Sequence, residues 1–126
     1  MKLGRRVYVI GNGGSLANAA HMVNDLLASG IKAYTIDLAT MTAFANDLGY
    51  ENAFAKWIEI VGEPEDTLIA LSGSGKSPNI LNAVEQAERI GMTVHKVFGA
   101  DMGMDMQKAE EYQIVLAHSM RKLACA

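Results

Sequence analysis

A serine- and glycine-rich segment carries the clearest chemistry in this sequence. Ser72, Ser74 and Ser77 lie among glycines, immediately before Pro78. Serine hydroxyls donate hydrogen bonds to phosphate oxygens, and glycine lets the backbone approach a ligand closely. Unpaired N–H groups at the start of a helix add a partial positive charge that favours an anion. The segment therefore predicts a phosphate-binding loop, whereas a plain turn with a capping serine explains Ser77 alone.

A histidine and a carboxylate form the second candidate group. His21 and Asp25 share one side of a predicted helix with Asn18, because residues three or four apart lie on the same helix face. Such a pair moves protons near neutral pH and also binds metal ions. The simpler alternative is a solvated helix face with one weak charge contact, and spacing alone favours it. The stripe expected to face the sheet consists of Leu16, Ala20, Val23 and Leu27.

Neither glycine-rich segment fits a nucleotide-binding motif. Gly75-Lys76-Ser77 ends like a Walker A loop, but that loop requires glycine five residues before Gly75, where this chain has Ala70. Residues 11–15, Gly-Asn-Gly-Gly-Ser, are followed by Leu16, where the dinucleotide fingerprint requires a small residue. Nucleotide binding is therefore the weakest of the functions considered.

Short β-branched runs alternate with helical patterns along the chain, which is typical of βαβ units. The predicted strands are residues 6–10, 32–38, 67–71, 93–98 and 112–116, and the predicted helices are residues 15–29, 40–47, 52–61, 78–89 and 101–110. The residues after 116 are too few to predict another stable helix. The sequence thus predicts one α/β domain, residues 1–126, with a central parallel sheet whose ligands bind at the carboxyl ends of the strands.

The composition narrows the class of protein. The chain has 11 Lys+Arg against 14 Asp+Glu, a net charge of −3, and charges of both signs are scattered along it. Duplex DNA and anionic membranes both require clustered basic residues. The apolar runs are short, no signal-peptide pattern is present, and Cys125 alone cannot form an internal disulfide. These features predict a cytoplasmic protein that binds neither nucleic acid nor membrane.

Three segments in this order resemble the sugar isomerase (SIS) domain, and within it the phosphoheptose isomerases. They are residues 11–15 with the following His21 and Asp25, residues 46–50 (Asn-Asp-Leu-Gly-Tyr), and residues 71–79. The resemblance covers about residues 7–115. It implies a three-layer sandwich around a five-stranded parallel sheet of flavodoxin-like strand order. It also implies conversion of sedoheptulose 7-phosphate into a seven-carbon aldose phosphate through proton transfer at C1 and C2.

The resemblance also implies roles for individual residues. The residues implied to bind the phosphate are Ser72, Gly73, Ser74 and Ser77. Those implied to bind the rest of the sugar are Asn12, Gly13, Ser15 and Asp47. His21 matches a histidine that ligates zinc in some family members. Asp25 matches a glutamate that acts as base or metal ligand, and it is one methylene shorter. We therefore expect His21 and Asp25 to be catalytic, and to be the ligands where zinc is bound.

The ends of the chain depart from the family pattern. Family members continue past the fifth strand into a helix with a glutamine and, eight residues on, a histidine, whereas Arg121 lies eight residues beyond Gln113 here. The family's N-terminal helix, which builds dimers and tetramers, has no counterpart before residue 6. We expect a family core without either terminal helix, as a short natural form or a fragment. One sheet face is then partly uncovered, which favours a homo-oligomer, most simply a dimer.

Two functions remain. The first is aldose–ketose isomerisation of a sugar phosphate, with Asp25 carrying the proton and His118 or a partner subunit supplying the second acid. The second is a sugar-phosphate-binding module or assembly partner without turnover, which the expected loss of the terminal helix favours.

Overall fold

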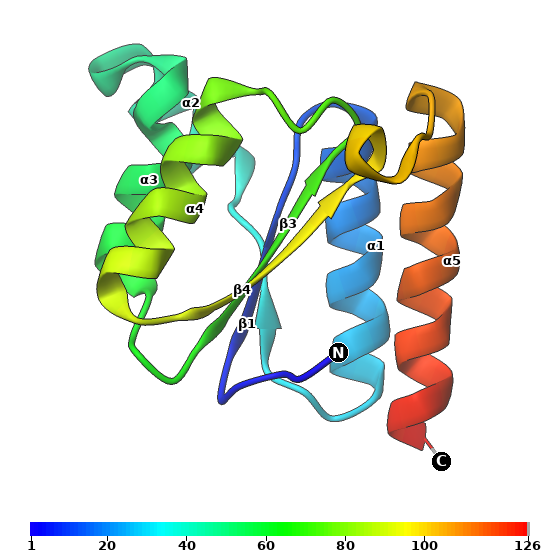
Figure 1. Cartoon of the computed structure of the whole chain (residues 1–126). Coiled ribbons are helices and arrows are strands. Elements are labelled where there is room, and N and C mark those ends of the chain that lie inside the picture. Colours follow the sequence, from blue (N-terminus) through cyan, green and yellow to red (C-terminus); the bar gives the residue numbers. More distant parts are fainter. Residues whose placement is uncertain (126) are drawn as a thin grey trace.

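A four-stranded parallel sheet forms the centre of the computed structural model, which describes the backbone of residues 1–125 and the side chains of residues 1–121 (Figure 1). The strands are β1 (Val7–Ile10), β2 (Ala33–Tyr34), β3 (Thr67–Ser72) and β4 (Thr93–Phe98), in the order β2-β1-β3-β4. All neighbouring strands are parallel. The strand order reverses between β1 and β3, and α/β proteins bind ligands at the carboxyl ends of strands at such a point.

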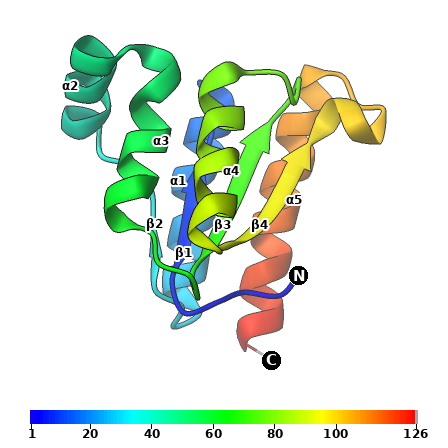
Figure 2. The ribbon, with the colours of Figure 1, turned by 60° about the vertical axis from the view of Figure 1, so that its left-hand side comes forward.

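Two layers of helices cover the sheet, as Figures 1 and 2 show from two sides. One layer consists of α1 (Gly14–Ala28) and α5 (Met106–Cys125), and the other of α2 (Leu38–Leu48), α3 (Tyr50–Val61) and α4 (Pro78–Ile90). A short 3-10 helix, η1 (Gly99–Met102), joins β4 to α5. The predicted α/β architecture with three layers is confirmed.

Alternate side chains of β1 enter two separate cores. Val7 and Val9 pack with the α1 and α5 layer, whereas Tyr8 and Ile10 pack with the α3 and α4 layer. All four are at most 5% exposed. Burial on both faces explains why the strands are continuous apolar runs rather than alternating ones.

The predicted fifth strand is wrong, because residues 112–116 belong to α5. A short apolar run does not distinguish a strand from a helix. Over a longer window, the buried positions of α5 recur every three or four residues, which is the helical period, at Ala109, Gln113, Ala117 and Met120. A helix therefore does follow β4, and together with α1 it covers the sheet face that was expected to be partly bare.

The buried face of α1 also differs from the predicted stripe. Ala19, Met22 and Leu26 are fully buried, whereas Leu27 is 54% exposed. The reason is that α1 has two partners, the sheet and α5, and a helical wheel of α1 alone cannot include α5. The side of α1 that carries Asp25 was expected to stay outside the core, yet Asp25 is 1% exposed.

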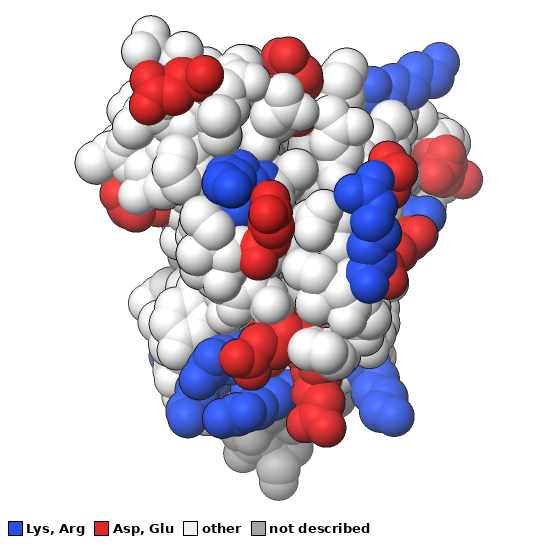
Figure 3. All heavy atoms as spheres, turned by 90° about the vertical axis from the view of Figure 1, so that its left-hand side faces the viewer, with Lys and Arg blue, Asp and Glu red and all other residues white. Residues whose placement is uncertain are grey.

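Charged side chains of both signs are mixed on the face formed by α2, α3 and α4 (Figure 3). Ion pairs on this face include Lys56 with Glu59 at 3.7 Å and Arg89 with Glu85 at 2.6 Å. This face therefore has no continuous basic surface of the kind that binds a nucleic acid backbone. In the described part of the chain, no helix has both the length and the apolar character needed to cross a membrane.

Candidate functional site

A small hollow of about 50 Å³ lies where β1 and β3 end. The loop after β1 and the first turn of α1, the end of β3 and the loop after it, and the start of α5 supply its lining. The lining residues are Asn12, Ser15, Leu71, Ser72, Gly73, Ser74, Ser77 and Met106. Six of the eight residues predicted to bind the sugar phosphate are among them. The parallel pairing of β1 with β3 is what brings the two loops together.

The serine hydroxyls of the hollow keep their protons available for a ligand. Ser72 Oγ accepts a hydrogen bond from the Gly75 N–H at 2.9 Å, and Ser74 Oγ accepts one from the Lys76 N–H at 3.1 Å. These bonds orient the hydroxyls and use only acceptor capacity. Ser77 precedes α4, but its side chain makes no capping hydrogen bond. The simple explanation of Ser77 as a helix cap therefore fails, and all three O–H groups can donate.

Helix α4 and Met106 complete the hollow. Helix α4 begins at Pro78, directly after Ser77, so the partial positive charge of its N-terminus lies at this end of the sheet. On the other side, the Met106 thioether lies against Gly73 so closely that any Cβ there would overlap it. A side chain at residue 73 would therefore displace the flexible Met106 side chain, which is 55% exposed.

The other two predicted ligand residues, Gly13 and Asp47, do not line this hollow. Gly13 is the N-cap residue before α1 and has a φ of 53°, a conformation that glycine adopts readily. Asp47 lies near the end of α2, exposed, where it accepts a hydrogen bond from the Asn46 amide at 3.2 Å. Contact of either residue with a sugar stays a prediction.

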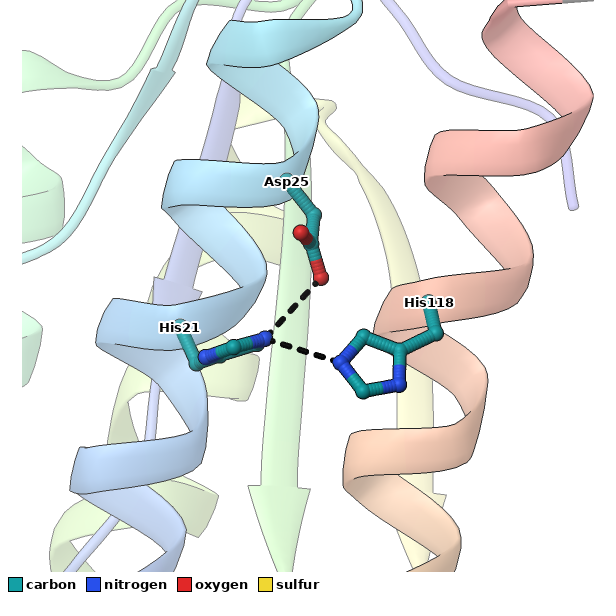
Figure 4. Close-up of side chains that lie close together, drawn as sticks. All are labelled: His21, Asp25 and His118. Atoms are coloured by element: carbon teal, nitrogen blue, oxygen red, sulfur yellow. Dashed lines mark hydrogen bonds and ion pairs between the residues drawn. The ribbon is translucent and has the colours of Figure 1, made fainter.

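A second group of polar side chains lies between α1 and α5 (Figure 4). His21 Nε2 is 3.0 Å from His118 Nε2 and 3.3 Å from Asp25 Oδ2. The His21 side chain is 42% exposed, whereas Asp25 is 1% exposed. Asp25 Oδ1 lies 3.5 Å from a guanidinium nitrogen of Arg121, and Oδ2 receives no hydrogen bond from any described residue. The predicted pair of His21 and Asp25 is thus joined by a histidine from α5.

Gln113 fastens α5 to α1 between the hollow and this cluster. It is 1% exposed, donates to Ser15 Oγ at 3.1 Å and accepts from Asn18 Nδ2 at 2.9 Å. Sequence reasoning assigned Gln113 to a strand and so missed this contact. The signal that was available is the helical spacing of Ala109, Gln113 and Ala117.

The cluster residues fit a metal ion. One ligand atom from each of His21, Asp25 and His118 lies within 4.8 Å of the others. Two imidazole nitrogens and a carboxylate are a common zinc donor set, and two ligands of a tetrahedral zinc ion are about 3.3 Å apart, close to the observed separation of the histidines. The buried Asp25 Oδ2 without a hydrogen bond also favours a cation beside it.

The hollow and the cluster share helix α1. Ser15 and His21 are six residues apart on this helix. At a rise of 1.5 Å per residue, they are separated by about 9 Å along its axis. The hollow and the cluster therefore lie less than two turns of α1 apart.

A model of the SIS domain family matches residues 1–99 of the chain. The chain belongs to the SIS domain family. Its curated relatives include the phosphoheptose isomerase of Akkermansia muciniphila, 36% identical over 92% of this chain, and that of Helicobacter pylori strain P12, 39% identical over 78% of this chain. The chain spans 65% and 55% of the lengths of these two relatives.

Solved structures of phosphoheptose isomerases have the same fold as this SIS chain. The enzyme of Neisseria gonorrhoeae aligns with a TM-score of 0.85 and 27% identity, over 94% of this chain and 75% of that one. The enzyme of Francisella tularensis aligns with a TM-score of 0.84 and 30% identity, over 94% of this chain and 74% of that one. These alignments extend beyond the range of the family model and agree with a sheet covered on both faces.

Proposed function

We propose that the chain is an aldose–ketose isomerase of a sugar phosphate, with sedoheptulose 7-phosphate as the substrate. The observation that carries this proposal is the arrangement along α1, with donor hydroxyls at Ser72, Ser74 and Ser77 near one end and a proton-transfer cluster about 9 Å further along the helix. The similarity to phosphoheptose isomerases supports the choice of substrate.

Binding at the hollow orients the substrate. The phosphate oxygens accept hydrogen bonds from the serine hydroxyls and from the loop backbone at Gly73, and the start of α4 stabilises their charge. Asn12 and Ser15 contact the sugar chain, whose carbonyl end then extends along α1 toward His21. Fixing the phosphate in this way holds C1 and C2 near the cluster, so that proton transfer takes place within the bound complex.

The cluster transfers the proton. One group removes a C1 proton of the ketose, and the electron pair forms the C1–C2 double bond while the carbonyl oxygen at C2 takes up a proton, which gives an enediol. A proton then adds to C2 while the C1 hydroxyl loses its proton, which gives the aldose. His21 and His118 are the groups with exposed rings, so we assign the contact with substrate to them. Asp25 lies behind His21, with Oδ2 3.3 Å from the imidazole Nε2, and we assign it a positioning role.

Zinc is the metal that we propose for His21, Asp25 and His118. When bound, it would supply a Lewis acid that polarises the substrate carbonyl. Without zinc, His21 and His118 hold and transfer protons at their ring nitrogens.

The direct test is incubation with sedoheptulose 7-phosphate, with and without zinc, followed by separation of the aldose and ketose phosphates. Aldose phosphate should form in proportion to the amount of protein. Absence of aldose under both conditions would contradict the proposal.

A second candidate function is binding without turnover. The burial of Asp25, at 1% exposure, favours it, because a buried carboxylate does not touch a ligand. Calorimetric titration that shows tight binding of sedoheptulose 7-phosphate, in a protein that forms no aldose, would select this alternative.

Self-association and a cytoplasmic location complete the proposal. Exposed apolar side chains at Leu38 (72%), Leu48 (43%) and Tyr50 (52%) support association with a second copy, because large exposed apolar groups mark contact surfaces. Light scattering at micromolar concentration should give the mass of at least a dimer, and a monomer would refute it. The single cysteine suits a reducing compartment.

A further inference from the structure

Three side chains form a closed hydrogen-bond network at the edge of the hollow. Asn12 Nδ2 donates to Asn79 Oδ1 at 2.9 Å, and Asn79 Nδ2 donates back to Asn12 Oδ1 at 2.7 Å. The Tyr50 hydroxyl donates to the same Asn12 oxygen at 2.8 Å. The network therefore joins the loop after β1 to the first turns of α3 and α4.

The backbone sets the direction of these bonds. The Ile80 N–H can only donate, and it donates to Asn79 Oδ1 at 3.0 Å while also lying 3.1 Å from the Ser77 carbonyl oxygen. Asn79 therefore turns its oxygen toward Ile80 and its amine toward Asn12 Oδ1. Asn79 is 2% exposed, so a reversed amide would place donor against donor where water cannot intervene.

This direction decides what Asn12 offers to a ligand. Its oxygen already accepts two hydrogen bonds, and one of its two N–H groups is used in the pair with Asn79. The second N–H has no partner among the described residues, and Asn12 lines the hollow. The amide thus has one free donor and no free acceptor.

We propose that Asn79 and Tyr50 are positioning residues that lock Asn12 so that it presents only an N–H donor to the ligand. The locked amide selects an oxygen acceptor at this place, such as a hydroxyl, carbonyl or phosphate oxygen, over a protonated amine. The identity of the ligand rests on the proposed function, but the lock itself is a property of the ligand-free protein.

The lock is tested first without any ligand, by NMR of the side-chain amide groups of the whole ¹⁵N-labelled chain. The Asn12 signals are assigned as those that disappear in Asn12→Asp. The two Asn12 Nδ2 protons should differ, one exchanging slowly with water and the other freely. Tyr50→Phe should shift both Asn12 signals, and the matched Tyr34→Phe should leave them unchanged. Equally fast exchange of both protons with water would overturn the lock.

The effect on binding is measured by calorimetry with sedoheptulose 7-phosphate. Tyr50→Phe should weaken affinity by about threefold, because Asn79 still orients Asn12. Asn79→Asp should weaken it more than about tenfold at neutral pH, because a carboxylate only accepts and turns the Asn12 oxygen toward the hollow.

A matched variant tests whether added negative charge by itself weakens binding. Asn82→Asp adds the same charge one turn along α4, where Asn82 bonds only the Glu51 carbonyl, and it should change affinity less than about twofold. Relative to the wild type at each pH, affinity of Asn79→Asp should recover as the introduced carboxyl group is protonated and regains a donor. Equal losses in the two variants, or a loss independent of pH, would overturn the proposal.

The two proposals fail in different ways. A locked Asn12 amide in a protein that does not bind sedoheptulose 7-phosphate contradicts the proposed function and leaves the lock standing. A freely exchanging amide in a protein that binds and isomerises the sugar phosphate contradicts the lock alone.

Discussion

The hollow and the His21–Asp25–His118 cluster hold their polar groups in different ways. In the hollow, Ser72 and Ser74 are oriented by backbone N–H groups three and two residues further along the same loop. In the cluster, His21 and His118 are 97 residues apart and meet only because α5 packs on α1. The side chains of the hollow carry hydroxyls and amides, whereas those of the cluster are imidazoles and a carboxylate. Binding and proton transfer are thus built on different parts of the fold, and variants should separate them.

The largest effect is expected from His118→Ala. Loss of one of the two proton-transfer groups should lower kcat by at least about 100-fold, with the affinity for sedoheptulose 7-phosphate within about twofold of the wild type. Steady-state kinetics and calorimetry measure the two quantities. His95→Ala, which alters a histidine on β4, is the control and should keep full activity. An equal loss of affinity in His118→Ala would mean that the two regions are not separable.

Zinc should stabilise the cluster region. At zinc concentrations about 100 times Kd, binding to the native state adds about 2.7 kcal/mol to the free energy of unfolding. Denaturant unfolding with zinc and with a chelator measures this difference. It should vanish in His118→Ala and persist in Ser77→Ala, whereas stabilisation of both variants by zinc would place the metal elsewhere.

Ser77→Ala and Ser72→Ala should distinguish ligand contacts from loop contacts. The Ser77 side chain makes no capping bond, so its removal should weaken sugar phosphate binding by about fivefold to tenfold and leave the free energy of unfolding within about 0.5 kcal/mol. Ser72→Ala also loses the bond from the Gly75 N–H and should cost about 1 kcal/mol of stability in addition.

Calorimetry and denaturant unfolding measure the two effects. Ser119→Ala, on the exposed side of α5, is the control for both. A stability loss in Ser77→Ala as large as that in Ser72→Ala would show that the Ser77 hydroxyl supports the loop instead.

The smallest effect concerns the pH dependence at the start of α2. Hydrogen bonds from the Thr40 N–H and hydroxyl lower the pKa of Asp37 below its usual value. A carboxyl group whose pKa is lower in the folded state stabilises that state above its unfolded pKa, and this stabilisation is lost as the pH falls through the folded pKa.

Asp37→Ala should therefore lower the unfolding free energy at neutral pH, and the difference from the wild type should disappear in acid. Urea unfolding over a pH series measures it. Thr42→Ala, in the same helix, removes no carboxyl group and should show no such pH dependence. A difference for Asp37→Ala that persists in acid would contradict the assignment.

The same contrast explains how much could be predicted from the sequence. The hollow was predictable, because its residues lie in two short segments that directly follow strands, and the parallel sheet brings the ends of those strands together. The direction in which the Asn12 amide donates was not predictable, because its hydrogen bond with Asn79 joins residues 67 positions apart.

The cluster was predictable only in part. His21 and Asp25 are four residues apart on α1, but the burial of Asp25 depends on α5, whose segment Tyr112 to Leu116 the sequence predicts as a strand. A helical wheel assigns faces relative to one partner, and α1 has two. Tertiary packing therefore decided which residues of α1 are buried and brought His118 to His21.

The most direct test of the account is ¹H NMR of sedoheptulose 7-phosphate incubated with the wild-type chain in D₂O. We expect a signal from the aldose phosphate, with deuterium from the solvent entering at C1 of the ketose and C2 of the aldose, and exchange at least about 100-fold slower with His118→Ala. A wild-type protein that binds the sugar phosphate but forms no aldose and exchanges no hydrogen at either carbon would contradict it.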